Sequence, residues 1–66
     1  MEMIRVSSSA ISAIGYDPET MRMRIKFKDG NTYDYCRVPD HVFESFMRSF
    51  SKGTYYQNHI RDRYQC

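Results

Sequence analysis

The chain has 66 residues, of which 41% are hydrophobic, 15% aromatic and 27% charged, and its formal net charge is +2 at pH 7. A chain this short forms one domain with a small core, and buries only about 60% of the surface that its unfolded form exposes. No stretch approaches the roughly 20 apolar residues that span a bilayer, which excludes a membrane-spanning protein. The first nine residues lack the pattern of a secretion signal, so we expect a cytoplasmic protein.

The two cysteines, Cys36 and Cys66, are too far apart for the Cys-x-x-Cys spacing of metal and redox sites. Because no secretion signal precedes them, we do not expect a structural disulfide. We interpret Cys36 as a small strand residue and Cys66 as a terminal thiol without a chemical role.

Three segments have the pattern of strands. Residues 10–16 form a plausible first strand, and the turn Asp17-Pro18-Glu19-Thr20 follows it. In residues 21–28 apolar side chains alternate strictly with arginine and lysine, which is the period of a strand with one buried face. Asp29-Gly30 interrupts this alternation and residues 32–38 resume it, so a β-hairpin is predicted.

The register of this hairpin decides which face each side chain takes, because a shift of one residue moves every side chain to the opposite face. A three-residue loop over residues 28–30, with its glycine left-handed, places apolar residues opposite tyrosines and Arg24 opposite Asp34. A two-residue turn at Asp29-Gly30 would instead place Asp34 opposite Ile25 on the apolar face, where an unpaired carboxylate is costly. We prefer the three-residue loop.

Two helices are predicted after the sheet. Pro39 suits the first turn of the first helix, and Asp40 favours its positive end. The apolar residues that follow at helical spacing are Val42, Phe43, Phe46, Met47 and Phe50. Ser51 can cap a second short helix, in which Tyr56 and Ile60 face the same way. The predicted fold class is α+β, a three-stranded antiparallel β-meander followed by two short C-terminal helices packed on one face.

The order and spacing of short segments along nearly the whole chain form a further pattern. These segments are Val6-Ser7-Ser8-Ser9 with Ile11, Ile14-Gly15-Tyr16-Asp17, Phe27 with Gly30, Tyr33-Asp34-Tyr35, Val38-Pro39, and Ser51-Lys52-Gly53 with Tyr56, Asn58 and Ile60. The pattern resembles the KTSC domain family, named after the C-terminal extension of some lysyl-tRNA synthetases and found mostly as stand-alone proteins of bacteria and phages. The resemblance implies one complete domain over residues 1–66. It also implies that Tyr33, Tyr35, Ser51, Gly53 and Asn58 occupy the family's recurrent positions. RNA binding is only an analogy with the synthetase.

Catalysis has no support in the sequence. The two histidines, His41 and His59, are not spaced with a second ligand as in metal sites, and Asp40 beside His41 is interpreted as helix capping. A domain of this size also has little room for an enclosed substrate pocket. We expect no enzymatic activity, no cofactor and no metal.

Positive charge is concentrated between residues 21 and 37, which contain five Lys and Arg residues against two Asp residues. Four of the five, Arg22, Arg24, Lys26 and Lys28, project to one side of the predicted strand, and Arg37 extends the patch only in the two-residue-turn register. Such a row can follow a phosphate backbone. The alternative is an ordinary solvated face, because a net charge of +2 is low for a nucleic-acid-binding domain.

Two other groups of residues allow a structural and a functional interpretation. Tyr33 and Tyr35 either pack against the helices, which we prefer, or stack on unpaired bases. The segment 51–54 either caps a helix, with Asn58 bonding back to it, or holds an anion. We prefer the cap, although three basic residues near this segment favour the anion. They are Lys52, Arg61 and Arg63.

The leading hypothesis is a non-catalytic accessory module that binds RNA or single-stranded nucleic acid through the basic sheet face. Duplex DNA is disfavoured because no predicted helix is rich in base-reading side chains. The alternative is a protein-interaction module, such as a phage or prophage factor that modulates a host enzyme through the same face or through residues 51–64. The sequence leaves the oligomeric state open, although a strand edge near Ala10 could pair with another copy.

Overall fold

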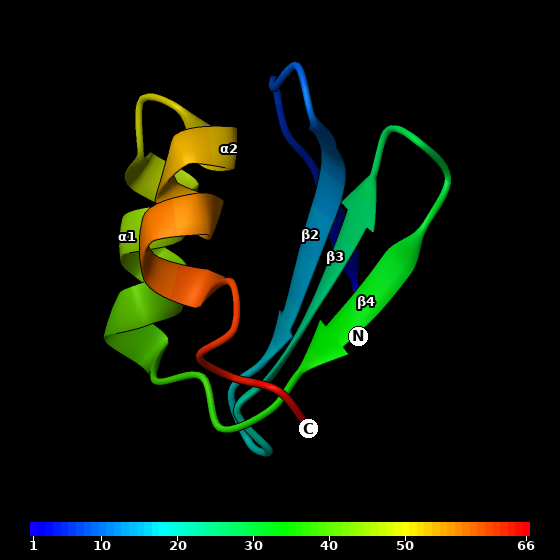
Figure 1. Ribbon diagram of the computed structural model, residues 1–66. Helices are drawn as coiled ribbons and strands as arrows, with labels where there is room; N and C mark the ends of the chain where they lie inside the picture. Colours follow the sequence, from blue (N-terminus) through cyan, green and yellow to red (C-terminus); the bar gives the residue numbers. More distant parts are fainter.

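The computed structural model describes all residues, 1–66, as an antiparallel sheet covered on one face by helices (Figure 1). The strands are β1 (Met3–Arg5), β2 (Ile11–Asp17), β3 (Arg22–Phe27) and β4 (Thr32–Tyr35), in the order β1-β2-β3-β4 across the sheet. The predicted α+β class is confirmed, and the three predicted strands correspond to β2, β3 and β4. No helix is long and apolar enough to cross a bilayer.

The predicted number of strands is wrong, because β1 adds a fourth. It pairs with β2 through Ile4 opposite Ile14, but its three residues are too few to show an alternating pattern. The strand near Ala10 is therefore not an edge, since β1 covers its outer side. Gly15 of β2 leaves the space for this approach, because a Cβ atom at Gly15 would lie 2.7 Å from Met3 Sδ.

The β3–β4 hairpin has the preferred register. Arg24 lies opposite Asp34 and Ile25 lies opposite Tyr33. The Phe27 N–H donates to the Asn31 carbonyl at 2.8 Å, so residues 28–30 form the loop. Gly30 in this loop has φ of +100°, a conformation that glycine adopts without steric cost.

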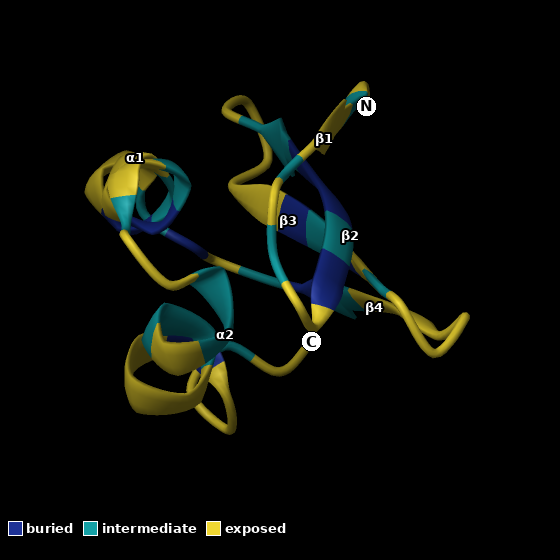
Figure 2. Ribbon diagram, turned by 90° about the horizontal axis from the view of Figure 1, so that it is seen from above, coloured by how far each residue is buried: buried dark blue, intermediate teal, exposed yellow.

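The helical half consists of α1 (Asp40–Arg48), α2 (Lys52–Tyr55) and a π-helical turn, η1 (Tyr56–Ile60), which continues from α2. Figure 2 shows these helices on one side of the sheet, with buried segments of β2 and β3 in dark blue. The buried residues that form the core are Ile11, Ile14, Met23, Ile25, Tyr35, Val38, Val42, Phe46 and Ile60. The apolar face of the sheet and the apolar residues of the helices, both predicted from their spacing, therefore pack into one core.

Phe50 is the exception among the predicted apolar residues of the first helix. The Ser49 N–H and hydroxyl both donate to the Phe46 carbonyl, at 3.2 and 2.7 Å, and the helix ends at Arg48, two residues before Phe50. Phe50 then lies outside the helix and is fully exposed. Its expected place in the core was wrong.

The expectation about the cysteines was also wrong, because Cys36 and Cys66 form a disulfide with their Cα atoms 4.8 Å apart. The disulfide was not expected because the sequence shows no secretion signal, which is a statement about the redox compartment and not about the geometry of the two residues. Asp62, with φ of +62°, turns the chain back after η1, and Gln65 then forms an antiparallel bridge with Tyr35. Cys36 itself follows β4 rather than lying within a strand.

Replacing Phe46 with Ala should lower the free energy of unfolding by about 3–5 kcal/mol, because it removes the largest fully buried side chain. In so small a domain this loss should abolish the cooperative thermal transition. Phe50→Ala is the matched control, since it removes the same atoms from an exposed position and should leave the transition nearly unchanged. A Phe46→Ala protein that unfolds at the wild-type temperature would contradict the placement of Phe46 in the core.

Candidate nucleic-acid interface

A cleft of about 740 Å³ separates the β1–β2 loop from the connection between α1 and α2. The residues that line it are Arg5, Val6, Ser7, Ser8, Ser9, Lys28, Phe50, Ser51 and Lys52. Three of these are basic, four are serines and none is acidic. Figure 1 shows that the loop and α2 lie at the same end of the molecule. The cleft is therefore a positively charged, hydroxyl-rich surface.

Ala10 is the point where the three segments of the cleft meet. Its carbonyl accepts the Lys28 N–H at 2.9 Å, which fixes the β3–β4 loop beside the β1–β2 loop. On the other side Gly53 of α2 lies next to Ala10, since a Cβ atom at Gly53 would be 3.7 Å from the Ala10 methyl carbon. Segments that are far apart in sequence are thus brought to one place by backbone contacts.

Serine hydroxyls shape the loop on one wall of the cleft. Ser8 Oγ accepts the backbone N–H groups of Ala10 and Ile11, each at 3.2 Å. This is a local side-chain-to-backbone turn that replaces the bonds of a regular strand. Ser7 and Ser9 are exposed and make no hydrogen bond within the chain, so their hydroxyls are available to a ligand.

The opposite wall is the start of α2, and the predicted cap is confirmed there. Ser51 Oγ accepts the Thr54 N–H at 3.3 Å and donates to the Thr54 hydroxyl at 3.0 Å. Lys52 Nζ donates to the Ser49 carbonyl at 2.8 Å, which holds the ammonium group at this wall and leaves it two further N–H donors. The anion-binding interpretation of this segment remains a prediction.

Phe50 lines the cleft, although its sequence pattern predicted a place in the core. Its helical spacing from Phe46 and Phe43 assigned it to the core, whereas its ring lies fully exposed at the cleft. Arg5 was missed as well, because a single arginine before the serines has no distinctive context. The serines themselves belong to the segments that carry the family resemblance, which was the only signal for this region.

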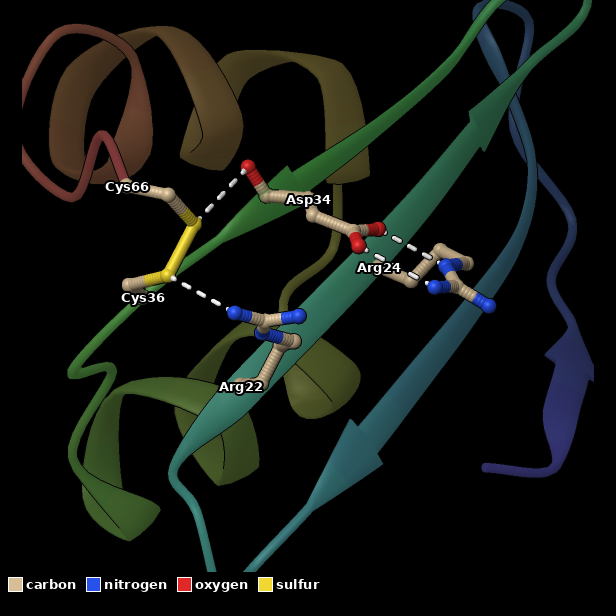
Figure 3. The surroundings of a disulfide bond; sticks show 5 residues. All are labelled: Arg22, Arg24, Asp34, Cys36 and Cys66. Carbon is tan, nitrogen blue, oxygen red and sulfur yellow. Dashed lines mark hydrogen bonds and ion pairs between the residues drawn. A yellow bond between two sulfur atoms is a disulfide. The ribbon is translucent and has the colours of Figure 1, made fainter.

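The outer face of the sheet has fewer available charges than its sequence predicts. Arg24 forms a bidentate ion pair with Asp34, Nε to Oδ1 at 2.7 Å and Nη2 to Oδ2 at 3.0 Å (Figure 3). Arg22 lies with Nη2 3.7 Å from Cys36 Sγ. Lys26 is exposed on this face, whereas Lys28 lines the cleft. The four basic residues of β3 and its loop therefore do not form one continuous patch. Only Lys26 is both exposed on the outer face and free of such a contact.

The two tyrosines of β4, Tyr33 and Tyr35, differ in burial. Tyr35 is buried, as preferred, and its hydroxyl shares a 2.8 Å hydrogen bond with the Tyr56 hydroxyl. Tyr33 is 51% exposed, so its assignment to the core was wrong. It lies near the loop end of β4, where Phe27 contacts its ring edge-on with the centroids 5.8 Å apart.

The remaining predicted residues lie elsewhere. Arg37 lies in a left-handed conformation after β4, with φ of +56°. Asn58, Arg61 and Arg63 are exposed, and Asn58 makes no hydrogen bond back to the Ser51 loop. Of the predicted site, the structure thus brings together Lys28, Ser51 and Lys52 at the cleft. Tyr33, Tyr35 and Arg61 line a second hollow, and Arg22 and Arg37 line a third.

The fold and the site together define a small α+β domain with a basic cleft. The model of the KTSC domain matches residues 7–64, and the chain belongs to this family. A KTSC domain protein from Yersinia pestis, known from its crystal structure, has a TM-score of 0.95 with 37% identity, over 98% of this chain and 92% of that chain.

Sequence relatives extend the comparison. A protein from Tsukamurella paurometabola is 37% identical over 61 residues, 92% of this chain and 91% of its own. A lysine–tRNA ligase from a Nostoc species is 30% identical over 63 residues, which are 96% of this chain but 11% of the ligase. The domain therefore corresponds to a small region of that enzyme.

The ion pair on the outer face predicts an acid-sensitive contribution to stability. Hydrogen bonds from Arg24 are the largest cause that lowers the pKa of Asp34. A lowered carboxyl pKa stabilises the fold above the unfolded value of about 3.9, and this stabilisation is lost as the pH falls through the folded value. Asp34→Asn should therefore be less stable than wild type at neutral pH.

Urea unfolding of both proteins at neutral pH and at several pH values below about 4 checks this, and the difference should shrink as the pH falls. Glu19→Gln is the control, because Glu19 is exposed and forms no ion pair. A difference for Asp34→Asn that stays constant down to the lowest pH would show that the pair is not responsible.

Proposed function

We propose that this KTSC domain is a non-catalytic accessory module that binds single-stranded or structured RNA in the basic cleft. The observation that carries the proposal is the fully exposed ring of Phe50 at a cleft whose charged side chains are all positive. Contact of an apolar ring with water is unfavourable, so covering the ring with a partner lowers the free energy. A nucleobase is such a partner, because it offers a flat face on which the ring can stack.

The two kinds of group in the cleft match the two parts of a nucleotide. The basic side chains Arg5, Lys28 and Lys52 suit phosphates, since binding releases the counterions condensed on a nucleic acid. The ring of Phe50 suits an unpaired base, with a stacking contribution of about 1–3 kcal/mol. The exposed hydroxyls of Ser7 and Ser9 can bond phosphate or ribose oxygens. A combination of stacking and backbone contacts is typical of single-strand recognition.

We place the contact in the cleft rather than on the outer sheet face, which the sequence favoured. The guanidinium of Arg24 is already engaged by Asp34, and its charge is neutralised there. A duplex groove is also disfavoured as the target. The longest helix, α1, exposes Asp40 and Glu44, which would be repelled by the phosphates on either side of a groove.

The relatives support RNA as the nucleic acid. Lysine–tRNA ligases act on tRNA, and this chain matches 11% of the length of one of them. A domain attached to such an enzyme lies near an RNA with single-stranded loops and a single-stranded end. We infer that the domain described here binds the same kind of nucleic acid.

Fluorescence anisotropy with a labelled 20-nucleotide single-stranded RNA, a DNA of the same sequence and a DNA duplex, over a salt series, tests the proposal. We expect micromolar binding to the RNA, with log affinity falling linearly with log salt. Absence of binding to every one of these at low salt would overturn the proposal and move the function to a protein partner.

Two charge-matched triple variants locate the site. Arg5→Gln/Lys28→Gln/Lys52→Gln should reduce the affinity and lower the salt slope by about one for each phosphate contact removed. Arg22→Gln/Arg24→Gln/Lys26→Gln removes the same charge from the outer sheet face and should bind nearly as wild type. The reverse result would assign the contact to the outer face.

Phe50→Ala tests the stacking contribution separately from charge. Loss of one stacked base should weaken binding by about 1–3 kcal/mol, which is roughly 5- to 150-fold, with an unchanged salt slope. The Phe50→Tyr variant keeps an aromatic ring and should retain most of the affinity. Equal affinities for Phe50→Ala and wild type would remove base stacking from the mechanism.

A further inference from the structure

The C-terminal residues form a strap along the outer edge of β4. The Tyr64 carbonyl accepts the Cys36 N–H at 2.8 Å, and Gln65 forms an isolated antiparallel bridge with Tyr35. Beyond these contacts, the disulfide between Cys36 and Cys66 is the connection that ties the last residue to the sheet. The strap covers an edge that would otherwise present free backbone groups.

The two sulfur atoms have different surroundings (Figure 3). Cys66 is exposed, and its Sγ lies 3.7 Å from the Asp34 carbonyl oxygen. Cys36 is partly buried, and the Arg22 guanidinium lies 3.7 Å from its Sγ. Arg22 forms no ion pair with a carboxylate, so its positive charge is available to this sulfur, whereas the neighbouring Arg24 is engaged by Asp34.

We propose that the Cys36–Cys66 disulfide is a thiol-exchange site that takes low-molecular-weight thiols at Cys66 and releases the C-terminal strap. The asymmetry of the two cysteines determines the direction of attack. An incoming thiolate attacks the sulfur of Cys66, which is the more exposed residue of the pair, and the sulfur that leaves is Cys36, whose negative charge Arg22 stabilises. A stabilised leaving thiolate accelerates exchange.

The exchange proceeds in two balanced steps. In the first, the thiolate forms a bond to Cys66 Sγ, the bond between Cys66 and Cys36 breaks, and Cys36 leaves as a thiolate. In the second, another thiolate attacks the added sulfur of the mixed disulfide and releases Cys66 as a thiolate, which takes a proton, as Cys36 does. Two thiols are oxidised to one disulfide, and the protein disulfide is reduced by two electrons to two thiols. The mixed disulfide at Cys66 is the modified form of the protein.

Release of the strap uncovers the outer edge of β4 without disturbing the core. None of the strap residues belongs to the buried cluster, although Tyr64 packs against its rim. The Cys36 N–H loses its partner, and the edge becomes free to accept another strand. The exchange site lies apart from the basic cleft, since the two share no lining residue, so this inference does not depend on RNA binding.

Hydrogen exchange by mass spectrometry or NMR, on the oxidised protein and on protein treated with reduced glutathione, tests the release. The Cys36 amide should exchange faster after reduction, while the Ile25 amide in the centre of the sheet should stay protected. Cys66→Ser should show the same pattern without any thiol. Unchanged protection of Cys36 would refute release of the strap, and loss of protection at Ile25 would show that the disulfide is instead needed for the whole fold.

The role of Arg22 is tested by the rate of reduction with glutathione, followed by the mass of the intact protein. Arg22→Gln should slow the reduction by about threefold. Lys26→Gln removes the same charge from the same face, away from the sulfurs, and should leave the rate unchanged. Equal rates for both variants, or an adduct of glutathione that forms first on Cys36, would contradict the proposed direction of attack.

Discussion

The left-handed backbone at Gly30 closes the three-residue loop between β3 and β4, and the register of this hairpin determines the two faces of the sheet. With this register Met23 and Ile25 face the helices, together with Tyr35, and the core forms around them. Arg24 and Asp34 meet on the outer face as an ion pair. A shift by one residue would exchange these faces and bury a carboxylate, which so small a domain could not tolerate.

The same loop also supplies one side of the cleft. Lys28 lies at the start of the loop, and its backbone N–H bonds to the Ala10 carbonyl, where Gly53 packs from the other side. Folding of the hairpin therefore places a basic side chain next to the serine loop and to α2. The cleft is a consequence of how the core assembles, and its exposed aromatic ring results from the early end of α1 at Ser49.

Local patterns in the sequence predicted the parts of the fold that local interactions decide. The alternation in residues 21–28 gave β3 and its faces, and Ser51 was correctly interpreted as a cap. The features that were missed depend on contacts between distant segments. Neither β1, with three residues, nor the disulfide, across 30 positions, leaves a periodic signal.

The candidate site was predictable only in part for the same reason. Lys28 and Lys52 were both named as candidate binding residues, but as parts of two separate groups. Their segments meet at Ala10, and nothing about an alanine in the sequence indicates such a meeting point. Phe50 was assigned to the core because its spacing from Phe46 is helical, and the side-chain bond of Ser49 that ends the helix overrides this spacing. The sequence pattern thus identified some basic residues of the cleft, but not its aromatic ring, Arg5 or the way in which these segments meet.

The most direct measurement is a titration of the isotopically labelled domain with single-stranded RNA, followed by the NMR signals of its backbone amides. The account predicts that the largest shifts occur in residues 5–9, around Lys28 and in residues 50–52, which line the cleft. Shifts concentrated in β3 and β4 on the outer face, with the cleft residues unchanged, would contradict it.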